Sequence, residues 1–168
     1  MILLRVDAAA GLMDTPLGPI PCAIGRNGIV AANVKREGDG ATPCGSWPIR
    51  GALLRSDRGF ASPSTALPWR WLRPADGWCD EPGDASYNRP VVNPHRGSAE
   101  RLWRDDALYD VIIVLGQNDT PPLAGRGSAI FLHVRPESGS TEGCLAVPRD
   151  ALLELLDLLA PGDMLTVA

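Results

Sequence analysis

The stretch AIFLHVRPESGSTEGCLAVP, residues 129–148, brings a histidine, a glycine and a cysteine into one short segment of this 168-residue chain. Ala129–Leu132 is an apolar run that predicts a strand, and His133 stands at its end, where a side chain can reach a surface cleft. The polar residues that follow, up to Cys144, predict a loop that folds back toward the histidine. The segment therefore places a thiol and an imidazole at one edge of a β-structure.

This pair of side chains suggests nucleophilic chemistry. A cysteine thiol has a pKa of about 8.5, so little thiolate exists at neutral pH unless a nearby base takes up the proton. His133 is the candidate base, because the only other histidine, His95, lies in a polar loop and is expected to be exposed. Gly143 has no side chain, so backbone N–H groups there can approach a substrate, as an oxyanion hole requires. The alternative is that Cys144 is a small buried hydrophobe and His133 a hydrogen-bonded core residue.

His133 and the segment Ser140–Leu145 resemble the signature of the L,D-transpeptidase catalytic domain (YkuD-like) family, in which a histidine is followed by a loop and then by Ser/Thr-His-Gly-Cys. The resemblance implies that Cys144 attacks a peptidoglycan stem peptide, forms a thioester and passes the acyl group to an amine of a second stem. It also implies that His133 is the general base and that the N–H groups of Gly143 and Cys144 hold the oxyanion.

Further residues extend this resemblance or depart from it. Thr141 occupies the Ser/Thr position, whereas Glu142 stands where the common motif has histidine and Ala146 where it has asparagine or arginine. The loop between the histidine and the cysteine is also shorter than in the commonest members. A second segment, Lys35–Gly45, has the pattern K-x-x-G-D-x-x-T-P-x-G and is similar to another part of the family's domain. By its local composition it is a turn-rich loop, and Ser46–Ile49 follows it as an apolar strand.

Composition limits the fold and the partners. The 18 glycines and 16 prolines disfavour long helices, and the resemblance implies a mainly β (α+β) domain over residues 1–168: a YkuD-like β-sandwich or open barrel of mixed sheets with a loop-rich insertion and one C-terminal core helix. The net charge of −4 gives no reason to bind nucleic acid. No apolar run approaches the roughly 18 residues of a membrane span, and no signal peptide is visible.

The family resemblance adds expectations about partners. Peptidoglycan stem peptides are the expected donor and acceptor, a carbapenem is an expected inhibitor, and the protein is expected to act as a monomer in the periplasm or cell envelope. No metal or organic cofactor is implied. Hydrolysis of the same thioester, giving a carboxypeptidase or amidase, stays open, as does a peptidoglycan-binding module without activity.

Several elements are predicted by local pattern. The expected elements are strands at Met1–Asp7, Ile20–Val30 with an Asn27-Gly28 hairpin turn, Tyr109–Gly116 and Met164–Val167, a short helix at Ser98–Asp106, and a core helix that begins at Pro148. Residues 51–105 form an insertion whose tryptophans fill a second small core or, alternatively, line a substrate groove. Within it, Gly77–Pro82 and Tyr87–Pro90 are candidates for a lid over the cleft.

Other polar residues are candidates for substrate binding. Asn118 is expected at the same sheet edge as His133, although a turn-stabilising role is equally consistent with its sequence. Arg126 and Arg135 flank the predicted catalytic strand and can pair with a substrate carboxylate, or they can be solvated surface residues. The remaining cysteines, at positions 22, 44 and 79, show no zinc-ligand spacing and are either buried thiols or include one disulfide.

Overall fold

The computed structural model describes residues 1–168, and strands are their main regular secondary structure. In chain order the elements are β1 (Leu3–Asp7), β2 (Leu12–Thr15), β3 (Gly18–Pro21), β4 (Ile29–Ala31), β5 (Thr42–Leu54), the 3₁₀ turn η1 (Ser56–Arg58), β6 (Trp69–Trp71), β7 (Asp76–Cys79), β8 (Pro90–Val92), β9 (Ala99–Arg101), β10 (Val111–Leu115), β11 (Phe131–Val134), β12 (Leu145–Val147), α1 (Arg149–Leu158) and β13 (Met164–Val167).

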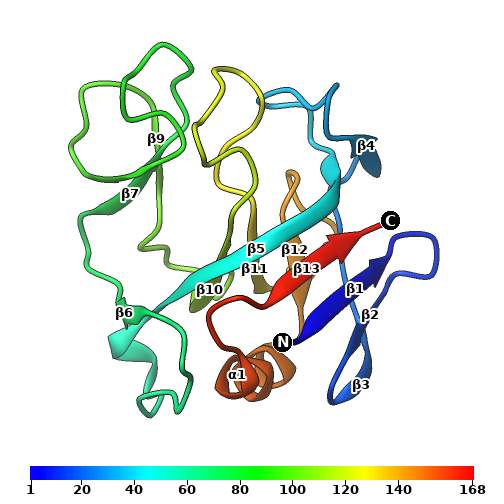
Figure 1. Cartoon of the computed structure of the whole chain (residues 1–168). Helices are drawn as coiled ribbons and strands as arrows, with labels where there is room; N and C mark the ends of the chain where they lie inside the picture. The colour runs from blue at the N-terminus through cyan, green and yellow to red at the C-terminus, as the bar shows by residue number, and fades with distance from the viewer.

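The long strand β5 connects the parts of the main sheet. Its 13 residues pair with four other strands: β4 and β6 in parallel, and β10 and β13 in antiparallel orientation. Figure 1 shows it in cyan, crossing the molecule from the β4 side to the β6 side. The main path of the sheet runs β12-β11-β10-β5-β13-β1-β2-β3. The predicted strand Tyr109–Gly116 is confirmed as β10, which lies between β5 and β11 with its side chains largely buried.

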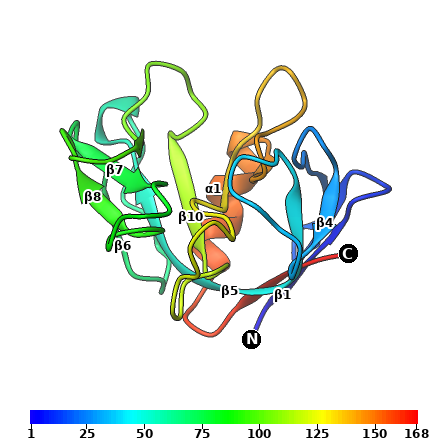
Figure 2. The same cartoon turned by 90° about the horizontal axis from the view of Figure 1, so that it is seen from above.

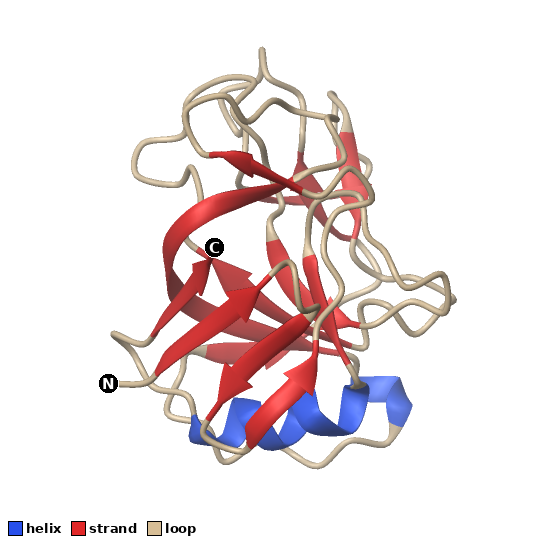
Figure 3. Cartoon of the chain, turned by 90° about the vertical axis from the view of Figure 1, so that its right-hand side faces the viewer, coloured by secondary structure: helices blue, strands red, loops and turns tan.

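The main sheet is mixed and curved. Seen from above, β10, β5 and β1 follow a bent path, so that the sheet is nearly closed like a barrel (Figure 2). The single α-helix, α1, contacts β10 and β11 and lies across one end of the strands (Figure 3). The helix begins directly after Pro148 and buries Leu152, Leu155 and Leu156. These observations confirm the predicted fold class: mainly β, with one C-terminal core helix.

The insertion carries a small sheet and packs against the main sheet through a second core. The strands β8, β7 and β9 form a separate three-stranded antiparallel sheet. Next to this sheet, the smaller of the two hydrophobic cores contains Leu53, Leu102 and Phe131, and the half-buried Trp78 and Trp103 pack against them. The expected second core is therefore present. The other three tryptophans pack on the larger core instead.

Three local predictions were wrong. Ile20–Val30 is not one strand: β3 ends at Pro21, and β4 begins at Ile29 and pairs in parallel with β5, so the turn at Asn27-Gly28 closes no hairpin. Thr42–Gly45 is part of β5 rather than loop. Ser98–Asp106 is not helical, because Ala99–Arg101 pairs with β7, and this long-range pairing overrides the weak helical spacing.

The structure contains no helix with the length and the apolar character that a membrane crossing would need.

Candidate active site

Two neighbouring strands position His133 and Cys144. His133 lies in β11, and Cys144 directly precedes β12, which pairs with β11 in parallel so that Leu132 is opposite Leu145. Both side chains line one cavity of about 490 Å³. The structure therefore brings the two predicted reactive groups to a single hollow.

The His133 ring is held in one orientation. It is 4% exposed, its Nδ1 lies 2.8 Å from the Val134 carbonyl oxygen, and Tyr109 packs edge-on against it at 5.2 Å between ring centroids. A carbonyl only accepts hydrogen bonds, so Nδ1 carries the proton and Nε2 keeps its lone pair. Burial lowers the pKa of His133 to about 4. At neutral pH the imidazole is therefore uncharged and able to accept a proton.

The Cys144 thiol is protonated when no substrate is bound. Its Sγ donates to the Ala129 carbonyl oxygen at 3.1 Å and accepts the Phe131 N–H at 3.4 Å. Burial raises the pKa of Cys144 to about 12, and the charge of Glu100 raises it further. The thiol and the imidazole are thus a neutral pair, and the thiol proton is directed at the Ala129 carbonyl oxygen.

The two family-like sequence segments meet beneath the thiol. Thr42, from the second segment, is fully buried and donates its hydroxyl to the Gly143 carbonyl oxygen at 2.9 Å. Thr42 Oγ1 also accepts the Gly25 N–H at 2.8 Å. A Cβ on Gly143 would lie 3.0 Å from the Ala41 carbonyl oxygen, and φ of Gly143 is +133°, so a glycine is required here. The start of β5 therefore supports the turn that presents Cys144.

The two predicted oxyanion donors differ in their hydrogen bonding. The Gly143 N–H donates to Thr141 Oγ1 at 3.1 Å, and the Thr141 hydroxyl donates to the Cys144 carbonyl oxygen at 2.6 Å. The Cys144 N–H makes no hydrogen bond within the chain. Of the two, the Cys144 N–H is the one free to receive negative charge without any rearrangement.

Two cationic side chains line the cavity, and both already have partners. Lys35 Nζ pairs with Asp39, and Arg104 pairs with Asp106 at 2.6 Å. The positive charge of Lys35 lowers the pKa of the Cys144 thiol, but by less than burial raises it. The cavity therefore has two positively charged side chains in its wall, and each of them is already paired with an aspartate.

A carboxyl group and a phenol line the cavity beside the reactive pair. The Tyr109 hydroxyl donates to Glu100, and burial raises the pKa of both groups. Neither residue was singled out as a site residue from the sequence. The local patterns predict a strand at Tyr109 and a helix at Glu100, and none of them indicates that the two side chains meet at the cavity.

Asn88 joins the insertion to the active site. It is 4% exposed, and its Oδ1 accepts the Trp78 indole N–H at 2.9 Å and the Ala129 N–H at 3.1 Å, while its Nδ2 donates to the Asn118 carbonyl oxygen at 2.7 Å. Ala129 has a φ of +53°, which is strained for a residue with a side chain. Asn88 thereby fixes the residue whose carbonyl receives the Cys144 thiol.

The predicted substrate-binding residues fall in different places. Thr141 lines the cavity, whereas Asn118, Arg126 and Arg135 do not. Asn118 bonds within its own loop: Nδ2 donates to the Gly127 carbonyl oxygen at 2.9 Å. Their roles in substrate binding stay predictions. None of the five tryptophans lines the cavity either.

The cysteines and the second histidine also have definite environments. All four cysteines are free thiols, and Cys22 and Cys79 are buried. His95 was expected to be exposed, but only 15% of its side chain is accessible, because it packs beside Asp84 at 3.3 Å. The loop that contains His95 is folded against the small sheet of the insertion.

A neutral imidazole on one strand of a curved β-sheet and a thiol directly before the neighbouring strand define a site of the cysteine–histidine class. The sequence profile of the YkuD family, the L,D-transpeptidase catalytic domain, matches residues 10–167. The chain therefore belongs to the YkuD L,D-transpeptidase catalytic domain family.

Solved structures of distant relatives resemble the chain weakly. L,D-transpeptidases 1 and 3 from Mycobacterium tuberculosis and an L,D-transpeptidase from Mycobacterium smegmatis are 12%, 13% and 13% identical to it, with TM-scores of 0.45, 0.48 and 0.49. Each comparison covers 99% of this chain but only 58%, 60% and 58% of the relative. No curated protein matches the sequence.

Proposed function

We propose that this chain is a cysteine L,D-transpeptidase that cross-links peptidoglycan stem peptides through a thioester on Cys144. The observation that carries this proposal is the cavity that Cys144 and His133 share, with His133 Nδ1 bonded to the Val134 carbonyl so that Nε2 is the proton acceptor. The periplasm or cell envelope is the compartment that this substrate requires.

The proposed reaction begins from the neutral pair. When a stem peptide enters, the Cys144 thiol leaves the Ala129 carbonyl, Sγ attacks the peptide carbonyl carbon, and the thiol proton passes to His133 Nε2. The Cys144 N–H receives the negative charge that develops on the carbonyl oxygen. Protonated His133 then gives its proton to the departing amine, which leaves the acyl group on sulfur. An amine of a second stem repeats these steps in reverse order and restores the thiol.

Cross-linking is tested with purified disaccharide-tetrapeptide and mass analysis of the products. The wild type and a Cys44→Ser variant, which loses a thiol outside the cavity, are expected to form cross-linked dimers, and Cys144→Ala is expected to form none. Tripeptide without dimer in the wild-type reaction would mean that water resolves the thioester, as in a carboxypeptidase. Unchanged tetrapeptide with all three proteins would favour a binding module and overturn the proposal.

Acylation of the thiol is tested separately with faropenem. A solved structure of Mycobacterium tuberculosis L,D-transpeptidase 3 holds a faropenem-derived adduct. We expect faropenem, and carbapenems, to add covalently to Cys144 of this chain, measured by intact mass. Cys144→Ala should show no adduct, and His133→Gln should form it much more slowly because the proton acceptor is lost.

A further inference from the structure

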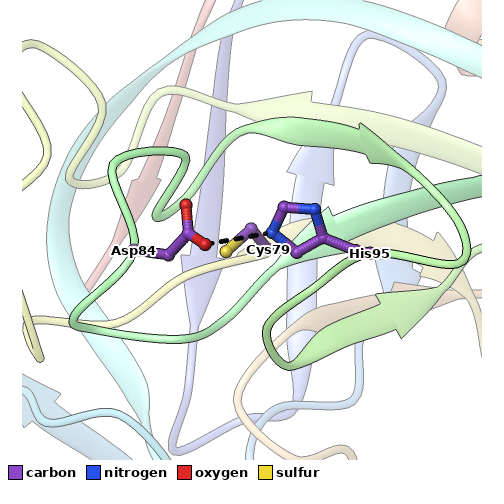
Figure 4. Close-up of side chains that lie close together, drawn as sticks. All are labelled: Cys79, Asp84 and His95. Atoms are coloured by element: carbon purple, nitrogen blue, oxygen red, sulfur yellow. Dashed lines mark ion pairs between the residues drawn. The ribbon is translucent and has the colours of Figure 1, made fainter.

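Three metal-binding side chains converge in the insertion, away from the cavity that holds Cys144. Cys79 ends β7, Asp84 lies in the turn that follows, and His95 lies in the loop between β8 and β9. One sulfur, one carboxylate oxygen and one ring nitrogen from these residues all lie within 4.8 Å of one another. Figure 4 shows the three side chains pointing toward a common centre.

The cluster is shielded from solvent and incompletely bonded. Cys79 is fully buried, and only 5% of the Asp84 side chain and 15% of the His95 side chain are accessible. His95 Nε2 is 3.3 Å from Asp84 Oδ2, close enough for an ion pair, yet this buried nitrogen makes no hydrogen bond. A buried ring nitrogen without a hydrogen bond is costly unless something else binds it.

We propose that Cys79, Asp84 and His95 form a zinc site that cross-links the two loops of the insertion. Zinc binds thiolate, imidazole and carboxylate at about 2.0–2.3 Å, which for a tetrahedral ion places ligand atoms roughly 3.3–3.6 Å apart. The Asp84–His95 distance of 3.3 Å already meets this spacing. A thiolate ligand selects zinc over magnesium or calcium, which prefer oxygen.

The surroundings orient the proposed ligands. Asp84 Oδ1 accepts the Ser86 N–H at 2.7 Å, and Oδ2 accepts the Arg96 Nε–H at 3.2 Å, which leaves Oδ2 a second lone pair for the ion. His95 also lines a surface cavity of about 550 Å³, so one of the three proposed ligands is reached from solvent. On binding, the Cys79 thiol releases its proton to solvent, and the thiolate and the carboxylate balance the double charge of the ion.

The location gives the site a structural role. Cys79 pairs with the segment that carries Asn88, since the Asn88 N–H donates to the Cys79 carbonyl oxygen at 2.9 Å. Asp80, the next residue, lines the cavity of Cys144. Zinc would therefore stiffen the wall of the active-site cavity and the loop that holds Ala129 in place. The inference does not depend on the proposed function.

Zinc binding is measured on the full chain with the Cys144→Ala substitution, so that the active-site thiol cannot contribute. After dialysis against zinc and then against buffer, we expect one zinc per chain by elemental analysis. Cobalt should give a thiolate-to-metal charge-transfer absorption. Adding Cys79→Ser or His95→Gln should lower zinc affinity at least about tenfold, measured by competition with a chromophoric chelator. Adding Cys22→Ser, which removes another buried thiol, should leave both the stoichiometry and the cobalt spectrum unchanged.

Folding is monitored for each variant by circular dichroism. If Cys79→Ser does not fold, His95→Gln decides the matter, because that side chain is partly accessible and its loss leaves no cavity in the core. Zinc that is bound equally by His95→Gln, a cobalt spectrum without thiolate absorption, or no retained zinc in the Cys144→Ala chain would each overturn the proposal.

Discussion

Replacing Thr42 with valine removes one hydroxyl from beneath the Cys144 turn and keeps the shape of the side chain. In the wild type this hydroxyl donates to the Gly143 carbonyl oxygen at 2.9 Å and accepts the Gly25 N–H at 2.8 Å, at a site with no solvent access. The substitution leaves two buried backbone groups without partners, each at about 1–3 kcal/mol. We therefore expect Thr42→Val to lower the free energy of unfolding by about 2–6 kcal/mol.

Matched variants separate the hydroxyl from the side-chain volume. Thr42→Ser keeps both hydrogen bonds and loses one methyl group, so it should cost only about 1 kcal/mol. Thr166→Val removes an exposed hydroxyl that bonds Ser46 at 2.7 Å and should change stability by less than about 0.5 kcal/mol. Urea unfolding measures the free energies, and the rate at which faropenem acylates Cys144 shows whether the turn is still in place.

The valine variant should also be acylated more slowly than the serine variant, because the Gly143 carbonyl is no longer anchored. If Thr42→Val unfolds at the same urea concentration as Thr42→Ser and reacts with faropenem at the same rate, the hydroxyl does not support the turn and the reasoning is refuted.

Three further predictions concern the site. Between pH 6.5 and about 4, His133 is protonated in the unfolded chain but not in the folded one. Its contribution to the free energy of unfolding, up to about 3 kcal/mol, is therefore present above pH 6.5 and is lost as the pH falls toward 4. Urea unfolding at several pH values should show a steeper loss of stability for the wild type than for His133→Gln. Gly143→Ala forces a side chain to adopt a φ of +133° and to meet the Ala41 carbonyl, so we expect a loss of about 1–3 kcal/mol and slower acylation by faropenem; wild-type stability and rate would contradict this. Arg104→Ala should raise KM for tetrapeptide roughly tenfold with a smaller change in kcat, whereas Arg5→Ala, an exposed arginine outside the cavity, should leave KM unchanged. Equal effects of the two substitutions would argue against a role for Arg104 in substrate binding.

Local sequence patterns correctly predicted the elements that have strong apolar runs. The run at Val111–Leu115 is apolar on both faces and is central in the sheet, and the leucine-rich segment after Pro148 forms α1. The segment Ser98–Asp106 shows where such patterns fail. Its spacing favours a helix weakly, and pairing with a strand some twenty residues earlier along the chain decides the outcome.

The candidate site was predictable only in part, for the same reason. His133 and Cys144 could be singled out because their residue types are rare and they share one loop. Glu100 and Tyr109 line the same cavity, but carboxylates and phenols are common, and only the fold brings them beside the thiol. The ligands of the proposed zinc site are spaced irregularly along the chain, so no short motif indicates them.

The position of β13 between β5 and β1 has a consequence for synthesis on the ribosome. β1 joins the main sheet through β13, and the Ile2 N–H donates to Asp163, 161 positions later. At a synthesis rate of roughly 5–20 residues per second, β13 is completed on the order of 10–30 s after β1, β2 and β3. During that interval the edge of β1 is open to wrong partners, so a nascent chain stalled before Met164 should be prone to aggregation.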